Sequence, residues 1–184
     1  MTPRLRAGGF RKERTMGQVA SIIKSLNTLT MGYADRVASG IGADQFRRMP
    51  KGVNTNSPAF NYGHLAIYPE RLLPLLGRPE LARPDEKWEE MFNAKAVCKD
   101  DPDGTVYPPM EQIMARFRDR YRVLLEVAAE TGDEVFARAN PNEQTAARFP
   151  TIGALVTFLT SAHLMMHLGQ ISAWRRIMGM GPAN

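Results

Sequence analysis

The strongest constraint on the fold is a long amphipathic pattern near the end of the chain, in residues 151–180. Apolar side chains recur there at steps of three and four residues, which places them on one face of an α-helix. Thr151 supplies an N-cap, and Gly179 and Gly181 end the pattern. The apolar positions are Ile152, Leu155, Val156, Leu159, Met166, Ile171, Trp174 and Ile177. We therefore expect a single helix with one buried side.

Two histidines, His163 and His167, lie within this stretch, four residues apart. Residues at this spacing have neighbouring side chains on one helix face, near enough for two imidazoles to bind one cation. The spacing alone is weak evidence, because most such pairs are ordinary helix residues. It indicates a metal site only if further ligands come from elsewhere in the chain.

Length and composition limit the classes of protein to consider. A chain of 184 residues that is 43% hydrophobic can form one domain with a sizeable core. Polar residues interrupt the longest apolar runs, which predicts that no segment spans a bilayer. Cys98 is the only cysteine, so an intrachain disulfide is excluded and a reducing, cytoplasmic location is favoured.

The positive charge is concentrated at the N-terminus. The formal net charge is +5, and residues 1–16 carry five basic residues against one acidic residue, which leaves +1 for the rest. The body has no basic face that could follow a phosphate backbone, so we expect no nucleic-acid partner. Residues 1–16 are predicted to be a basic, flexible extension or to precede a start at Met16, and residues 17–181 to form a single domain.

Three further segments have the one-sided apolar pattern of long helices: residues 16–38, 57–77 and 107–132. Pro69 falls inside the second segment, where it removes a backbone hydrogen bond and should kink the helix or split it in two. A short extra helical turn is expected near residues 85–95. Four long helices must bury their apolar faces against one another, so the predicted fold is an all-α four-helix bundle with long connections.

Four arginines alternate along the third of these helices, at positions 116, 118, 120 and 122. Alternate positions fan around a helix and do not line one face. We expect these arginines to lie at the surface and to pair with Glu111, Asp119 and Glu126.

The chain has three histidines, and the third, His64, lies on the inward stripe of the second predicted helix. We expect it to meet His163 and His167 inside the bundle. Three neutral imidazoles bind a divalent ion and leave coordination positions open for water or substrate. The alternative for each histidine by itself is a buried residue that is satisfied by a hydrogen bond.

Four polar residues are candidates to line the pocket or to hold a ligand: Asn61, Tyr68, Thr160 and Gln170. Gln170 is the one expected to orient a ligating histidine, whereas packing or helix-end roles explain the others equally well. No general base is evident, and the catalytic residues stay unknown. Leu164 follows His163 where zinc proteases have a glutamate, and Glu70 lies beyond the expected break at Pro69.

The combined pattern resembles a known family. Its elements are Asn61-Tyr62-Gly63-His64-Leu65, His163-x3-His167-x-Gly169-Gln170, Trp174-Arg175-Arg176, Trp88 and Tyr107-Pro108. In these positions, over about residues 17–181, the chain resembles the DinB/YfiT-like superfamily of metalloenzymes. The resemblance implies a DinB-like four-helix bundle, often a homodimer. It also implies that His64, His163 and His167 hold a divalent metal ion, zinc or nickel.

Two function classes remain open. Characterised relatives include thiol-dependent transferases and isomerases, and an ion with three neutral ligands acidifies a bound water or thiol. These considerations imply a metal-dependent enzyme, a hydrolase or thiol transferase, acting on an unidentified small molecule. The alternative, which the missing base supports, is a non-catalytic metal-stabilised bundle that serves as a binding or stress-response module.

Overall fold

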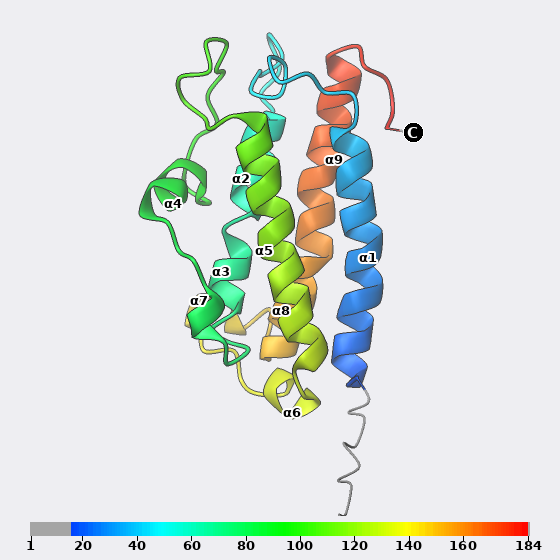
Figure 1. Ribbon diagram of the computed structural model, residues 1–184, viewed down its shortest axis with the longest axis vertical. Helices are drawn as coiled ribbons and strands as arrows, with labels where there is room; N and C mark the ends of the chain where they lie inside the picture. The colour runs from blue at the N-terminus through cyan, green and yellow to red at the C-terminus, as the bar shows by residue number, and fades with distance from the viewer. Residues whose placement is uncertain (1–15, 184) are drawn as a thin grey trace, which may run out of the picture.

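The computed structural model describes residues 16–183, so all of the predicted basic extension except Met16 lies outside the described residues. Figure 1 shows the arrangement of the helices. The elements are α1 (Gln18–Ala38), α2 (Pro58–Leu65), α3 (Tyr68–Leu72), η1 (Pro79–Leu81), α4 (Glu86–Phe92), α5 (Met110–Glu130), α6 (Asp133–Phe136), α7 (Glu143–Ala146), α8 (Ile152–Thr160) and α9 (Ala162–Ile177).

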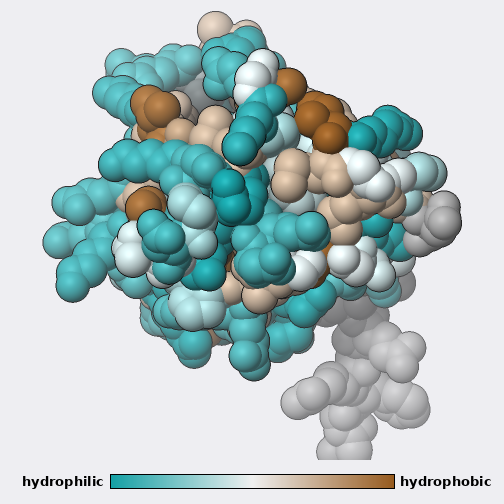
Figure 2. Space-filling view, turned by 90° about the horizontal axis from the view of Figure 1, so that it is seen from above, coloured by the Kyte–Doolittle hydropathy of each residue, from teal (hydrophilic) through white to brown (hydrophobic). Residues whose placement is uncertain are grey.

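The long helices form the predicted four-helix bundle. α1 packs against α5, α8 and α9, and α2 packs against α5 and α9. In Figure 1, α1 and the α8–α9 pair run in one direction, whereas the α2–α3 pair and α5 run in the other. The long connection between α3 and α5 permits these neighbours to be parallel. Seen from the end where the long loops lie, hydrophilic side chains cover most of the surface (Figure 2).

The second helix is split, as Pro69 predicts. α2 ends at Leu65 and α3 begins at Tyr68, with an Ile67 amide that donates to the His64 carbonyl at 3.3 Å in a tight turn. Because proline has no amide hydrogen, the carbonyl of Leu65 loses its helical partner at this point. The split lets α3 change direction directly after His64.

The last helix is not the single helix that the sequence predicts. It breaks at Ser161, whose backbone leaves the helical region with φ −132° and ψ −81°. The hydroxyls of Thr160 and Ser161 donate back to the carbonyls of Val156 and Thr157, which weakens a helix locally. The Thr160 carbonyl accepts instead from the Asn27 side chain of α1, at 2.9 Å. Ser161 directly precedes the first turn of α9, and that turn carries His163.

The last two helices bear on the expectation that no segment spans a bilayer. Residues 152–177 are long and apolar enough to cross a bilayer by length and composition alone. In the structure they form α8 and α9, whose inward side chains Leu164, Leu168 and Trp174 are fully buried in the bundle. The apolar composition therefore belongs to a core element, which packs against both α1 and α2.

Two apolar clusters fill the bundle. One joins α1, α2, α4, α5 and α9, and the other joins α1, α3, α5, α6 and α8. Tyr68 packs against both clusters.

Arg120 of α5 and Glu70 of α3 form a buried ion pair, so the prediction that Arg120 lies at the surface was wrong. Arg120 and Glu70 are 3% and 6% exposed, and their side chains meet through two hydrogen bonds, of 2.5 and 3.1 Å. The carboxylate also accepts from the Arg83 amide at 2.6 Å, and the guanidinium donates to the Leu81 carbonyl at 2.7 Å. Both oxygens of the Glu70 carboxylate therefore accept hydrogen bonds, and Glu70 is not available as a general base beside the histidines.

Gly63 of α2 lies directly against the Phe92 ring of α4, so Gly63→Ala should destabilise the fold. A Cβ at this position would stand 2.3 Å from Cε1 of the buried Phe92. We expect a loss of about 1–3 kcal/mol in the free energy of unfolding, measured by urea denaturation.

Gly169→Ala is the matched control, because nothing lies within 4 Å of its Cβ. Relief of the glycine penalty should stabilise that variant by up to about 1 kcal/mol. Equal effects at the two glycines would contradict this account.

Candidate metal centre

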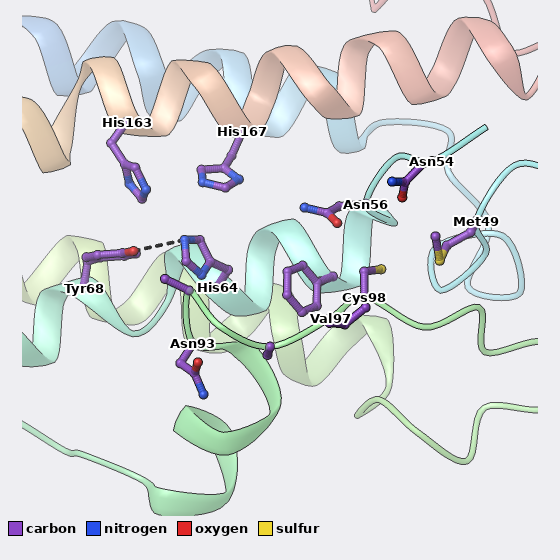
Figure 3. Close-up of a pocket in the computed structure, with 13 residues that line it drawn as sticks. Met49, Asn54, Asn56, His64, Tyr68, Asn93, Val97, Cys98, His163 and His167 are labelled. Carbon is purple, nitrogen blue, oxygen red and sulfur yellow. Dashed lines mark hydrogen bonds between the residues drawn. The ribbon is translucent and has the colours of Figure 1, made fainter.

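The three histidines meet in one place. His64 comes from α2, and His163 and His167 come from successive turns of α9 (Figure 3). One potential ligand atom from each side chain lies within 4.8 Å of the others. The ring centroids of His64 and His163 are 5.5 Å apart, and both rings lie near that of His167, at 4.7 Å. The structure thus brings together the only imidazoles of the chain, from segments about 100 residues apart.

In His64 and His167, hydrogen bonds determine which ring nitrogen is left without a proton. Nδ1 of His64 lies 2.7 Å from the Phe92 carbonyl, which can only accept, so Nδ1 carries the proton. Nδ1 of His167 lies 2.8 Å from Oδ1 of Asn61. The Asn61 amide nitrogen faces the carbonyls of Asn56 and Ser57, which assigns its oxygen to His167. Nε2 of both rings therefore keeps a lone pair for a cation.

Burial keeps these imidazoles neutral. It lowers the pKa of His163 to about 4 and the pKa of His167 to about 3, with a smaller contribution from the neighbouring histidines. Burial also lowers the pKa of His64, against an opposing effect of the Phe92 carbonyl. All three rings are thus unprotonated at pH 7, the state that a metal ligand requires.

The donor set fits a divalent ion. Nδ1 of His163 is buried and has no hydrogen-bond partner among the described residues, an orphan that is rare without a role. Three neutral imidazole nitrogens are a common zinc set and suit nickel as well. Ligand atoms within 4.8 Å of one another need only small side-chain rotations to reach the spacing of roughly 3.3 Å that tetrahedral bonds of 2.0–2.1 Å require. The three-histidine group could therefore hold a metal ion.

Tyr68 adds a phenol to this cluster. Its hydroxyl donates to Nε2 of His64 at 3.0 Å, and its ring lies 4.5 Å from that of His163 (Figure 3). Burial raises the pKa of Tyr68, so the group stays protonated at neutral pH and serves as a hydrogen-bond donor. Tyr68 is the first residue of α3, and Pro69 determines where this helix begins.

A cavity of about 470 Å³ opens over the histidines (Figure 3). Asparagines and apolar side chains line it, and no aspartate or glutamate occurs among its described lining residues. Besides the histidines and Tyr68, the lining includes Asn54, Asn56, Phe60, Asn93 and Cys98. The Cys98 sulfur is occupied, since it accepts from the Ser57 amide at 3.3 Å.

The polar candidates around the histidines have different roles. The hydrogen bond that orients His167 comes from Asn61, and not from Gln170 as the sequence led us to expect. The Gln170 side chain accepts instead from Asn56 at 3.4 Å. Thr160 has a helix-end role, because its hydroxyl donates to Val156 at 2.8 Å. The sequence gives no signal for the Phe92 carbonyl, because a backbone acceptor has no residue-type signature.

Asn61→Ala should weaken metal binding without removing a ligand. The change deletes the acceptor that fixes the His167 tautomer, and loss of such a partner typically costs about 10–100-fold in metal affinity. The measurement is competition for zinc with a chromogenic chelator. Gln170→Ala is the control and should retain affinity, since its amide contacts Asn56. If Gln170→Ala lost more affinity than Asn61→Ala, the assignment of these two amides would be reversed.

Comparison with protein families places the chain in a known group. A family model described as the DinB superfamily matches residues 29–171, which include all three histidines. No curated protein and no solved structure matches the chain.

Proposed function

The chain belongs to the DinB superfamily, and from this premise we propose that it is a metal-dependent enzyme, a hydrolase or thiol transferase that acts on a small molecule. The observation that carries the proposal is the convergence of three neutral imidazoles on a cavity of about 470 Å³. A three-histidine set leaves coordination positions open, whereas a purely structural zinc site is closed by four protein ligands.

His64, His163 and His167 would hold the ion, and zinc and nickel both suit this donor set. When bound, such an ion supplies Lewis acidity and lowers the pKa of a coordinated water or thiol. The chain itself keeps the rings neutral by burial and aims two of them through the Phe92 carbonyl and the Asn61 amide.

Tyr68 is the group we assign to the reaction itself. Its protonated hydroxyl lies beside the histidine nitrogens and can donate a hydrogen bond to negative charge that develops on a substrate oxygen. Such a preorganised donor is typically worth about 10²–10³ in turnover. The side chain must then turn away from Nε2 of His64, which it occupies here.

A second candidate function is a non-catalytic metal-stabilised bundle. The observation that favours it is the absence of a carboxylate among the described residues that line the cavity, because many metal hydrolases use one as a general base. The two candidates differ in what the open coordination positions do, and not in how the ion is held.

The test uses two simple reactions with metal-free protein and with protein reloaded with zinc or nickel. The reactions are hydrolysis of p-nitrophenyl acetate and displacement of chloride from 1-chloro-2,4-dinitrobenzene by glutathione. The enzyme proposal expects turnover in at least one reaction only after reloading, and a loss in Tyr68→Phe without loss of the ion. Turnover that is equal without metal would eliminate it. A loaded protein that is inactive, but strongly destabilised by chelation, would favour the non-catalytic candidate.

A further inference from the structure

A second cavity, of about 650 Å³, reaches the same histidines from other elements. Tyr68, Ala94 and His163 line both this cavity and the one described above. The remaining walls come from α3 and the turn after it, from α8 and from the segment 141–149. The volume lies in the range of pockets that bind small organic molecules.

Apolar side chains form most of the walls of the second cavity. They are Leu72, Leu75, Phe149, Leu155, Phe158 and Leu159. Phe149 and Phe158 stack with ring centroids 4.4 Å apart, and the Phe158 ring lies 5.8 Å from that of His163. An apolar surface is therefore continuous from the loop segment to the metal centre, as an aliphatic or aromatic body requires.

The charge of this cavity is positive. Arg71 and Arg148 line it, and no carboxylate occurs among its described lining residues. Arg71 is held by Glu89, at 2.6 Å, and lies over the Tyr68 ring. Arg148 is exposed, and its guanidinium has no hydrogen-bond or ion-pair partner within residues 16–183. Arg148 is thus free to pair with an anion.

Hydrogen bonds within the chain fix the wall that carries Arg148. The buried Asn140 donates to Thr145 at 3.0 Å and to the Phe149 carbonyl at 2.9 Å, and it accepts from the Asn142 amide at 3.0 Å. Its backbone amide also donates to the Pro150 carbonyl, at 3.0 Å. Because these bonds fix the segment before binding, little ordering entropy is lost when a ligand enters.

We propose that the second cavity binds the substrate, and that the substrate is a small amphiphilic carboxylate. Arg148 holds the carboxylate at the mouth, the aliphatic or aromatic body lies along Phe149 and Phe158, and the opposite end reaches His163 and Tyr68. This inference rests on the proposed function, since it assigns a substrate class to the same site. The first cavity, which asparagines line, then remains available for the water or thiol that reacts with the substrate.

The experiment compares two probes of equal length and opposite charge, octanoate and octylammonium, with metal-free protein at neutral pH. Binding is followed by isothermal titration calorimetry. Octanoate should bind about five- to tenfold more tightly than octylammonium, because only the carboxylate pairs with the free guanidinium. Arg148→Gln should abolish this preference. Arg138→Gln is the matched control, an exposed arginine three residues before that segment and outside the cavity, and should retain the preference.

The result that would overturn the proposal is the same affinity for both probes, no binding of either, or an unchanged preference in Arg148→Gln. His64→Ala separates this inference from the proposed function. That variant should keep the octanoate preference after it has lost the metal ion. Weak metal binding by the wild-type protein together with an intact octanoate preference would defeat the proposed function and leave the carboxylate site standing.

Discussion

Arg120→Met is expected to destabilise the protein by about 3–5 kcal/mol, because it leaves the Glu70 carboxylate buried without its cation. Both side chains are only 4% exposed, so water cannot replace the lost partner. The methionine keeps the apolar volume of the arginine stem, which confines the effect to the charge and its hydrogen bonds. Urea denaturation of the metal-free protein measures the loss.

Arg122→Met is the matched control for this prediction. Arg122 lies one turn or less away on the same helix and pairs with Asp119 and Glu126, both at 2.8 Å, but it is 59% exposed. Exposed pairs contribute roughly 0–1 kcal/mol, so the control should stay close to the wild type. A double variant, Arg120→Met with Glu70→Leu, should recover part of the stability by removing the unpaired charge. A loss below 1 kcal/mol in Arg120→Met would show that this pair does not support α3.

His64→Ala is expected to reduce zinc affinity by more than the roughly 10–100-fold that an orienting partner contributes, because it removes one of three ligands. His64 is the only ligand from α2, so without it the ion has just the two imidazoles of α9. The measurement is competition with a chromogenic chelator at pH 7. Tyr68→Phe is the control and should bind at least as tightly as the wild type, since it frees Nε2 of His64. Wild-type affinity in His64→Ala would place the ion elsewhere.

The sequence predicted the long helices, the split at Pro69 and the inward phase of the three histidines. These features are local, because periodicity and proline act within a few residues. The family resemblance is confirmed over residues 29–171. The homodimer, the cytoplasmic location and the identity of the metal stay predictions.

The features that the sequence did not reveal depend on partners far along the chain. Arg120 and Arg122 lie two residues apart on α5, and the buried carboxylate that pairs with Arg120 comes from Glu70, 50 residues earlier in the chain. The break at Ser161 depends on Asn27, more than 130 residues earlier, which takes the carbonyl of Thr160. Asn61 and Gln170 are both amides one turn from a histidine, and helix rotation decides which one reaches the ring.

X-ray absorption spectroscopy of the zinc-loaded, untagged protein tests the central claim most directly. The account predicts about three imidazole nitrogens at roughly 2.0–2.1 Å, with the remaining position filled by a light atom from solvent. A sulfur scatterer near roughly 2.3 Å, or fewer than two imidazoles, would place the ion away from His64, His163 and His167. Either result would contradict the metal centre and the chemistry proposed for it.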